Sequence, residues 1–169
     1  MSFITNHPDA SGAGKQDPER FAAAIKYFRQ GRRAQAFLIL SGLSAERDPA
    51  ARFALGLCHF HAGDLSLAIS CFEQALQLLK AMPVKPQGAA ENTDTYLKLA
   101  AAQIEDKTYL EPIDTDFCAL FPKASEHFVL LALIDAYQKK EMFEKAQQLS
   151  LGLTGPVFEA YKKKLAENQ

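Results

Sequence analysis

The stretch from Leu55 to Ala75 constrains the fold of this chain more than any other, because it encodes two helices joined by a tight turn. Gly63 stands between two runs whose apolar residues recur at helical spacing. Small residues alternate with large ones in these runs, at Gly56, Ala68 and Ala75. Two helices of this composition can approach closely, so we predict a helical hairpin.

The same punctuation recurs along the chain. Gly31 precedes Gly63 by 32 residues, and the predicted turn positions Lys107 and Glu141 are 34 residues apart. The pairs Asp17-Pro18 and Asp48-Pro49 each predict a helix start, because Asp can cap free backbone N–H groups and Pro has none to leave unpaired. The sequence therefore predicts several hairpins with one repeat length.

The second hairpin is similar to the tetratricopeptide repeat (TPR), a protein-binding family with a period of about 34 residues. The matching positions are Leu55, Gly56, Ala68, Phe72 and Ala75. The resemblance covers residues 17–154 and implies an all-α fold, in which antiparallel helical hairpins stack as a short right-handed TPR-like solenoid with a C-terminal capping helix. A generic antiparallel helical array is the alternative.

We expect a flexible N-terminal arm over residues 1–16 and a single TPR-like domain over residues 17–169. The third hairpin should have its return helix start at Glu111-Pro112 and end before Pro122. The expected parts of the domain are hairpins over 17–47, 49–80, 92–122 and 125–153, a Pro/Gly insertion over 81–91, and a capping helix over 156–167.

Composition limits the classes of partner. The 19 basic and 20 acidic residues give a formal net charge of -1, which provides no overall attraction to nucleic acid. The sequence shows no signal peptide and no run of about 18 apolar residues, so we expect a cytoplasmic protein without membrane insertion. The three cysteines are far apart among apolar residues, which predicts buried reduced thiols.

No catalytic or metal-binding pattern stands out. Cys58 and His61 share a helix face, but two ligands do not make a zinc site. Cys118 and His127 could supply a thiol nucleophile and its base, yet no orienting group follows at a motif spacing. We therefore predict a protein that is not an enzyme and has no catalytic residues, no metal and no cofactor.

The TPR resemblance implies that the first helices of the hairpins line a concave groove that binds proteins. The predicted function is a non-catalytic protein–protein interaction module, adaptor or chaperone-like, that binds an apolar peptide or helix in this groove. The expected lining consists of Phe21, Ile25, Phe28, Arg29, Phe53, Leu57, Phe60, His61, Leu97, Ile104, Leu131, Asp135 and Gln138.

Three alternatives remain open at this point. The aromatic stripe could be ordinary core, covered by the N-terminal arm through Phe3 and Ile4. The chain could be a structural homo-oligomer, such as a homodimer, whose groove is occupied by its own copy. It could also be a small-ligand-binding protein or a thiol enzyme that uses Cys58, His61 or Cys118, which would require these side chains to converge in one pocket.

Overall fold

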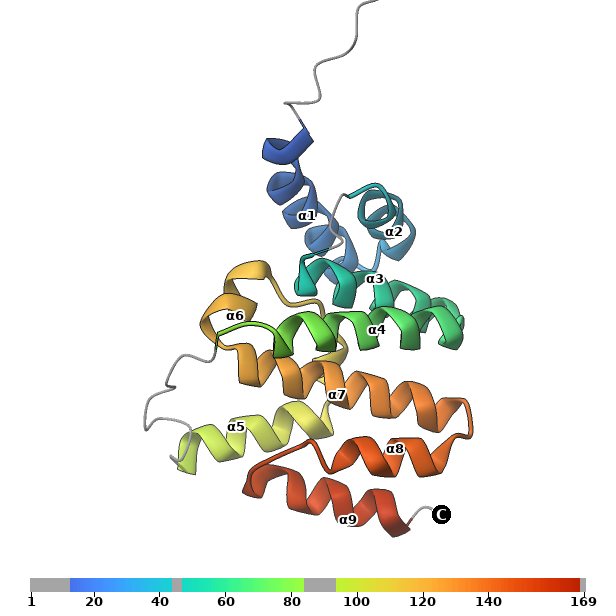
Figure 1. Ribbon diagram of the computed structural model, residues 1–169, viewed down its shortest axis with the longest axis vertical. Helices are drawn as coiled ribbons and strands as arrows, with labels where there is room; N and C mark the ends of the chain where they lie inside the picture. The colour runs from blue at the N-terminus through green and yellow to red at the C-terminus, as the bar shows by residue number, and fades with distance from the viewer. Residues whose placement is uncertain (1–12, 44–46, 84–93, 168–169) are drawn as a thin grey trace, which may run out of the picture.

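The computed structural model describes residues 13–43, 47–83 and 94–167, and all regular secondary structure within these ranges is helical (Figure 1). The expected all-α class is confirmed. The elements are α1 (Ala13–Arg29), α2 (Arg33–Ser41), α3 (Pro49–Ala62), α4 (Leu65–Lys80), α5 (Asp94–Glu105), the 3-10 turn η2 (Thr108–Leu110), α6 (Thr115–Leu120), α7 (Pro122–Lys139), α8 (Phe143–Ser150), the 3-10 turn η3 (Pro156–Phe158) and α9 (Glu159–Glu167).

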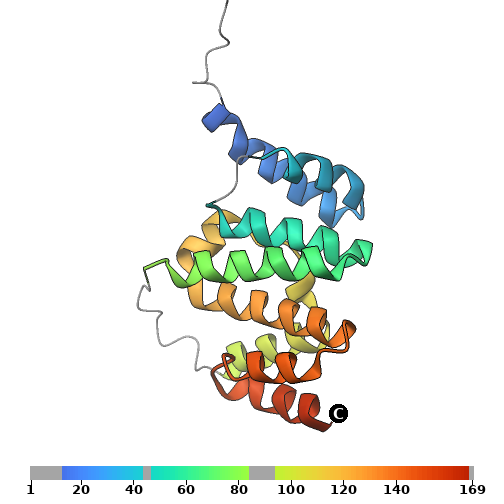
Figure 2. The same ribbon diagram turned by 45° about the vertical axis from the view of Figure 1, so that its right-hand side comes forward.

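Seven of these helices pack side by side in one continuous row. α1 packs on α2, α2 on α3, α3 on α4, α4 on α7, α7 on α8, and α8 on α9. Figures 1 and 2 show the row descending from the blue N-terminal helices to the red C-terminal one. The row therefore skips from the second predicted hairpin directly to the fourth.

The helices of the predicted third hairpin, residues 92–122, lie beside this row instead of within it. α5 makes its main contacts with η2 and η3, while α6 contacts α3 and α7. The expectation that α5 and α6 would stack as an ordinary repeat between α4 and α7 is therefore wrong. α6 spans only six residues, too few to provide a hairpin partner for the 12-residue α5.

All four predicted turn positions have a left-handed backbone. The φ angles are 76° at Gly31, 85° at Gly63, 55° at Lys107 and 59° at Glu141. Glycine adopts this region without steric cost, whereas Lys and Glu do so under mild strain. The turn spacing read from the sequence thus corresponds to a repeated backbone conformation.

Of the two Asp-Pro pairs, only the second starts a helix. Asp48 caps α3, because its Oδ1 accepts a hydrogen bond from the Ala50 N–H at 2.9 Å. The prediction that Asp17-Pro18 starts the first helix is wrong, since α1 begins at Ala13 and contains Pro18. Pro18 is the sixth residue of α1, beyond the first turn, so α1 lacks one i→i−4 hydrogen bond there.

The predicted boundaries around Pro112 and Pro122 also change. α6 begins at Thr115, after Asp114 has capped it by accepting a hydrogen bond from the Phe117 N–H at 2.7 Å. Pro122 occupies the first position of α7, so the fourth hairpin starts there and not after Ser125. Proline is favoured at the first helical position because it has no N–H group to leave unpaired. Pro122 therefore begins α7 as well as following the end of α6.

Gly56 allows α3 to approach α4 closely, as predicted from the small residue at this position. A Cβ atom placed on Gly56 would lie only 2.6 Å from the Phe72 ring. The same ring lies 5.5 Å from that of Phe53 between ring centroids. The α3–α4 contact thus depends on a missing side chain at Gly56.

Some expectations lie outside the described residues. These concern residues 1–12 of the expected arm, including Phe3 and Ile4, and residues 84–91 of the expected insertion. Residues 13–16 of the arm belong to α1. No helix in the described part of the chain has the length and apolar character needed to cross a membrane.

Candidate binding cleft

The residues predicted to line an open groove are mostly buried. Phe53 and Leu57 are each 0% exposed and Leu131 is 1% exposed, so they belong to the core. The full set divides into buried Phe21, Ile25, Phe28, Phe53, Leu57, Phe60, Leu131 and Asp135, partly buried Leu97, Ile104 and Gln138, and exposed Arg29 and His61. The apolar side chains of this set therefore do not form an open binding surface in this structure.

The chain itself covers much of this inner face. Residues 107–115, which we call the crossing segment, run from the end of α5 to α6. Within the crossing segment Tyr109 is 1% exposed and Ile113 is 7% exposed, and both belong to the same core cluster as Phe28, Phe53 and Leu131. The side chains of the segment therefore take the place that a bound peptide was expected to fill.

Polar contacts fasten the crossing segment to three helices of the row. Arg29 at the end of α1 donates a hydrogen bond to the Pro112 carbonyl at 3.3 Å. Thr115 donates to Asp48, the cap of α3, at 2.9 Å.

Asp135 on α7 provides the third attachment. Its Oδ2 atom accepts hydrogen bonds from Lys107 Nζ at 2.9 Å and from the Tyr109 hydroxyl at 3.0 Å. Asp135 is only 5% exposed, so this carboxylate is stabilised by the two donors in place of water. Burial and the Asp135 charge both raise the pKa of Tyr109, which keeps the phenol protonated as a donor.

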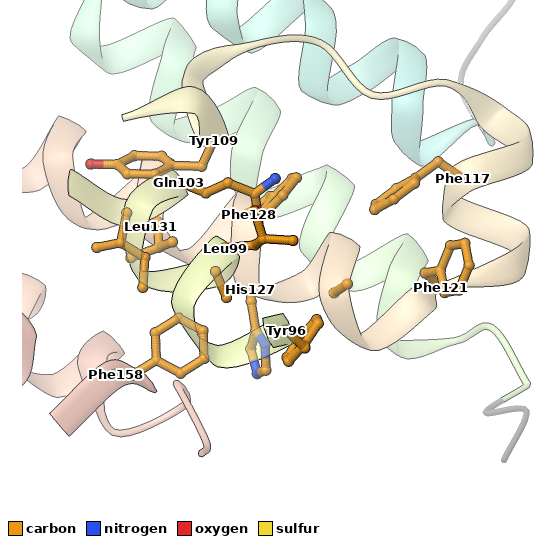
Figure 3. Close-up of a pocket in the computed structure, with 13 residues that line it drawn as sticks. Tyr96, Leu99, Gln103, Tyr109, Phe117, Phe121, His127, Phe128, Leu131 and Phe158 are labelled. Carbon is orange, nitrogen blue, oxygen red and sulfur yellow. The ribbon is translucent and has the colours of Figure 1, made fainter. Parts of the chain in front are cut away.

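An open apolar cleft lies between the displaced helices and α7. It has a volume of about 410 Å³ and lies between α5, η2, α6, α7 and η3. Figure 3 shows aromatic side chains from all of these elements around it. Its principal lining residues are Tyr96, Leu99, Gln103, Ile104, Tyr109, Phe117, Phe121, His127, Phe128, Leu131 and Phe158.

The aromatic side chains on one side of the cleft form a stacked group. The rings of Phe117 and Phe128 are nearly parallel, with an interplanar angle of 13° and centroids 6.0 Å apart. Phe121 lies 5.3 Å from Phe117. Aromatic groups of this kind hold their positions by packing and present rigid apolar surface.

Several lining residues remain open to solvent. Leu99 is 63% exposed, Phe121 44% and Tyr96 38%. α5, which carries two of these three, has no buried residue along its length. The cleft therefore combines a packed aromatic floor with an accessible apolar rim.

The cleft is uncharged at neutral pH. The described lining residues include no Asp, Glu, Lys or Arg. Burial, followed by the nearby Lys123 charge, lowers the pKa of His127 to about 4, so its imidazole is neutral at pH 7. That ring lies 4.7 Å from the ring of Phe158, with its Nε2 atom 3.5 Å from the Thr154 hydroxyl.

A second and more polar cavity of about 550 Å³ adjoins the cleft, sharing Ile104 and Tyr109 with it. Tyr161 lines this cavity, and its hydroxyl is buried without a hydrogen-bond partner among the described residues. Burial and the Asp135 charge raise the pKa of Tyr161, so the group stays protonated.

The thiols do not form a reactive centre. Burial raises the pKa of Cys58 to about 11 and that of Cys118 to about 12. A thiolate is the nucleophilic form, and it is scarce at neutral pH when the pKa is this high. Among the described residues no three His, Cys, Asp or Glu side chains are placed to share a metal ion.

No protein-family model matches the chain, and no curated protein matches it at a significant level.

Most of the cleft was not foreseen from the sequence. Of the predicted groove residues, only Ile104 and Leu131 line it. Phe117, Phe121 and Phe128 lie within the ranges of the third and fourth predicted hairpins, and with α5 and α6 displaced from the row they face the cleft. One available signal was Pro122, because proline can occupy the first position of a helix as well as follow the end of one.

Proposed function

We propose that this chain is a non-catalytic protein-interaction module of TPR-like build, adaptor or chaperone-like, that binds an apolar peptide or helix of another protein. The proposed site is the aromatic cleft, in place of the inner face that the crossing segment covers. The observation that carries the proposal is an uncharged aromatic cleft whose rim residues Leu99 and Phe121 are 63% and 44% exposed.

The shape and chemistry of the cleft support an apolar ligand. Exposed apolar surface that lines a concavity is typical of interaction sites in soluble proteins. A volume of about 410 Å³ accommodates a few apolar side chains of a peptide. An amphipathic helix is recognised by such a groove through anchors spaced three or four residues apart.

Site-specific cross-linking tests this proposal. A photoreactive benzoylphenylalanine replaces Leu99, which lines the cleft, or Leu38, which is 71% exposed on α2 and serves as the matched control. We expect the protein with the probe at position 99 to capture a specific polypeptide from a lysate of the source cells. A synthetic peptide from the captured segment should then bind the unmodified chain in calorimetry.

Paired substitutions complete the test. Leu99→Glu should weaken binding of that peptide at least about tenfold, because a charge in the cleft loses its hydration. Leu38→Glu should leave the affinity unchanged. Equal capture by the two probe positions, or equal affinity of the two variants, would contradict the proposal.

A small apolar molecule is a second candidate for the cleft. The cavity has the size of known small-molecule sites, and Gln103 and His127 supply the few polar groups such sites use for orientation. Native mass spectrometry of the purified chain would show a bound mass that Leu99→Glu removes. Absence of a bound mass, together with measurable peptide binding, would favour the peptide over the small molecule as the ligand of the cleft.

We propose a monomer over the homo-oligomer alternative. The inner face that a second copy was expected to fill already holds the crossing segment of the same chain. Sedimentation velocity over a range of concentrations measures this directly, and a concentration-independent monomer is the expected result.

A further inference from the structure

A row of positive charges lies over aromatic rings at the turn end of the hairpins. The Arg33 guanidinium, at the start of α2, lies 5.4 Å from the centroid of the Phe28 ring. The Lys139 ammonium, at the end of α7, lies 4.1 Å from the centroid of the Phe60 ring. Both rings are buried, so they hold the two cations in defined positions by cation–π attraction.

His61 lies between these two rings. Its imidazole centroid is 5.6 Å from that of Phe28 and 5.8 Å from that of Phe60. Burial lowers the pKa of His61, and the positive charges of Arg33 and Lys139 lower it further. The Leu110 backbone acts in the opposite direction and raises this pKa. Both cations therefore act on one exposed imidazole.

The row has no neutralising carboxylate in the described part of the chain. The ion pairs there involve Arg20, Lys98, Lys107, Lys123 and Lys162, and none includes Arg33 or Lys139. Arg33, His61 and Lys139 are all exposed. Since the whole chain has a formal net charge of -1, this concentration of positive charge is a local feature.

We propose that Arg33, His61 and Lys139 form a binding site for an acidic segment of a partner protein. The three groups come from α2, α3 and α7, three separate helices, and they share the rings of Phe28 and Phe60. Arg33, stacked on a ring, keeps the N–H edge that binds a carboxylate in a bidentate manner.

This surface is separate from the aromatic cleft, because none of the three residues lines that cleft. Binding of an acidic segment can therefore succeed or fail independently of the proposed function.

Fluorescence anisotropy with a labelled hexaglutamate peptide, amidated at its C-terminus, tests the site at low ionic strength. The double variant Arg33→Gln/Lys139→Gln should bind at least about tenfold more weakly, as expected when two ion pairs are lost. The double variant Lys80→Gln/Lys163→Gln removes the same charge from exposed positions on α4 and α9 and should change the affinity less than about twofold. Circular dichroism verifies that each variant is folded.

The imidazole of His61 provides a local readout. Titration by NMR should show that hexaglutamate raises the pKa of His61, because a carboxylate stabilises the imidazolium, whereas hexaglutamine leaves it unchanged. Equal losses in the two double variants, or no binding of hexaglutamate at low salt, would overturn the proposal. Displacement of the peptide by equimolar inorganic phosphate would also overturn it, since that result describes a single-anion site.

Discussion

At the scale of single residues, the turns show how local backbone conformation fixes the repeat. Gly31, Gly63, Lys107 and Glu141 share a left-handed φ, although only two of them are glycine. The strain at Lys107 accompanies an ion pair with the buried Asp135, whereas the exposed Glu141 forms no ion pair within the described residues. No ion pair within the described residues therefore offsets the backbone strain at Glu141.

Glu141→Gly should stabilise the protein by about 0.5 to 1 kcal/mol, because glycine adopts φ 59° without the steric cost. Glu144→Gly is the matched control, since the same substitution inside α8 should destabilise by about 1 kcal/mol. Urea unfolding of both variants measures the two free energies. A loss of stability in both would show that Glu141 is not strained.

His127 should make stability depend on pH. Its folded pKa of about 4 lies below the ordinary value of 6.5, so between these values the unfolded chain binds a proton that the folded chain does not. The free energy of unfolding should therefore fall as the pH drops through this window. His127→Gln should make the fall less steep, and parallel curves for the two proteins would contradict the assigned pKa.

At the scale of elements, the crossing segment replaces an ordinary repeat. Tyr109 and Ile113 fill the interior between α1, α3 and α7, while Asp135 holds Lys107 and Tyr109 in place. This exchange leaves α5 and α6 beside the helix row and opens the aromatic cleft. The cleft and the closure of the inner face thus have one structural cause.

Asp135→Asn should loosen the crossing segment. Removing the charge from a buried, paired carboxylate should cost about 2 to 4 kcal/mol of unfolding free energy. Trypsin should then cleave faster after Lys107 than in the unmodified chain.

The control for this experiment is Asp94→Asn, which removes the exposed partner of Lys98 on α5 and should cost less than about 0.5 kcal/mol. Similar cleavage rates in the two variants would show that Asp135 does not hold the segment.

At the scale of the whole molecule, the cysteines report on global unfolding. Cys58, Cys71 and Cys118 are buried in the core, and burial raises the pKa of each thiol. They lie in α3, α4 and α6, so opening of a single helix end would not release all of them.

The thiols of the native protein should react slowly with Ellman's reagent at pH 8. In urea all 3 thiols should react rapidly. The slow phase should follow the rate of global unfolding. Fast reaction of one thiol in the native protein would mean that its surroundings open locally, and it would renew the case for a reactive cysteine.

The sequence predicted those features that depend on neighbouring residues. The turns at Gly31 and Gly63, the Asp48 cap and the close approach at Gly56 all follow from short-range stereochemistry, and the structure contains each of them. The helical class follows from apolar periodicity for the same reason.

The tertiary structure alone decided which helices pack together. A repeat length predicts hairpins, but it does not show that α4 packs on α7 or that residues 107–115 fill the inner face, because these contacts join residues far apart in the chain. The periodicity that marked Phe53, Leu57 and Leu131 as one stripe is the same for a core and for an open groove. Only the position of the crossing segment makes them core and leaves Leu99 and Phe121 facing the cleft.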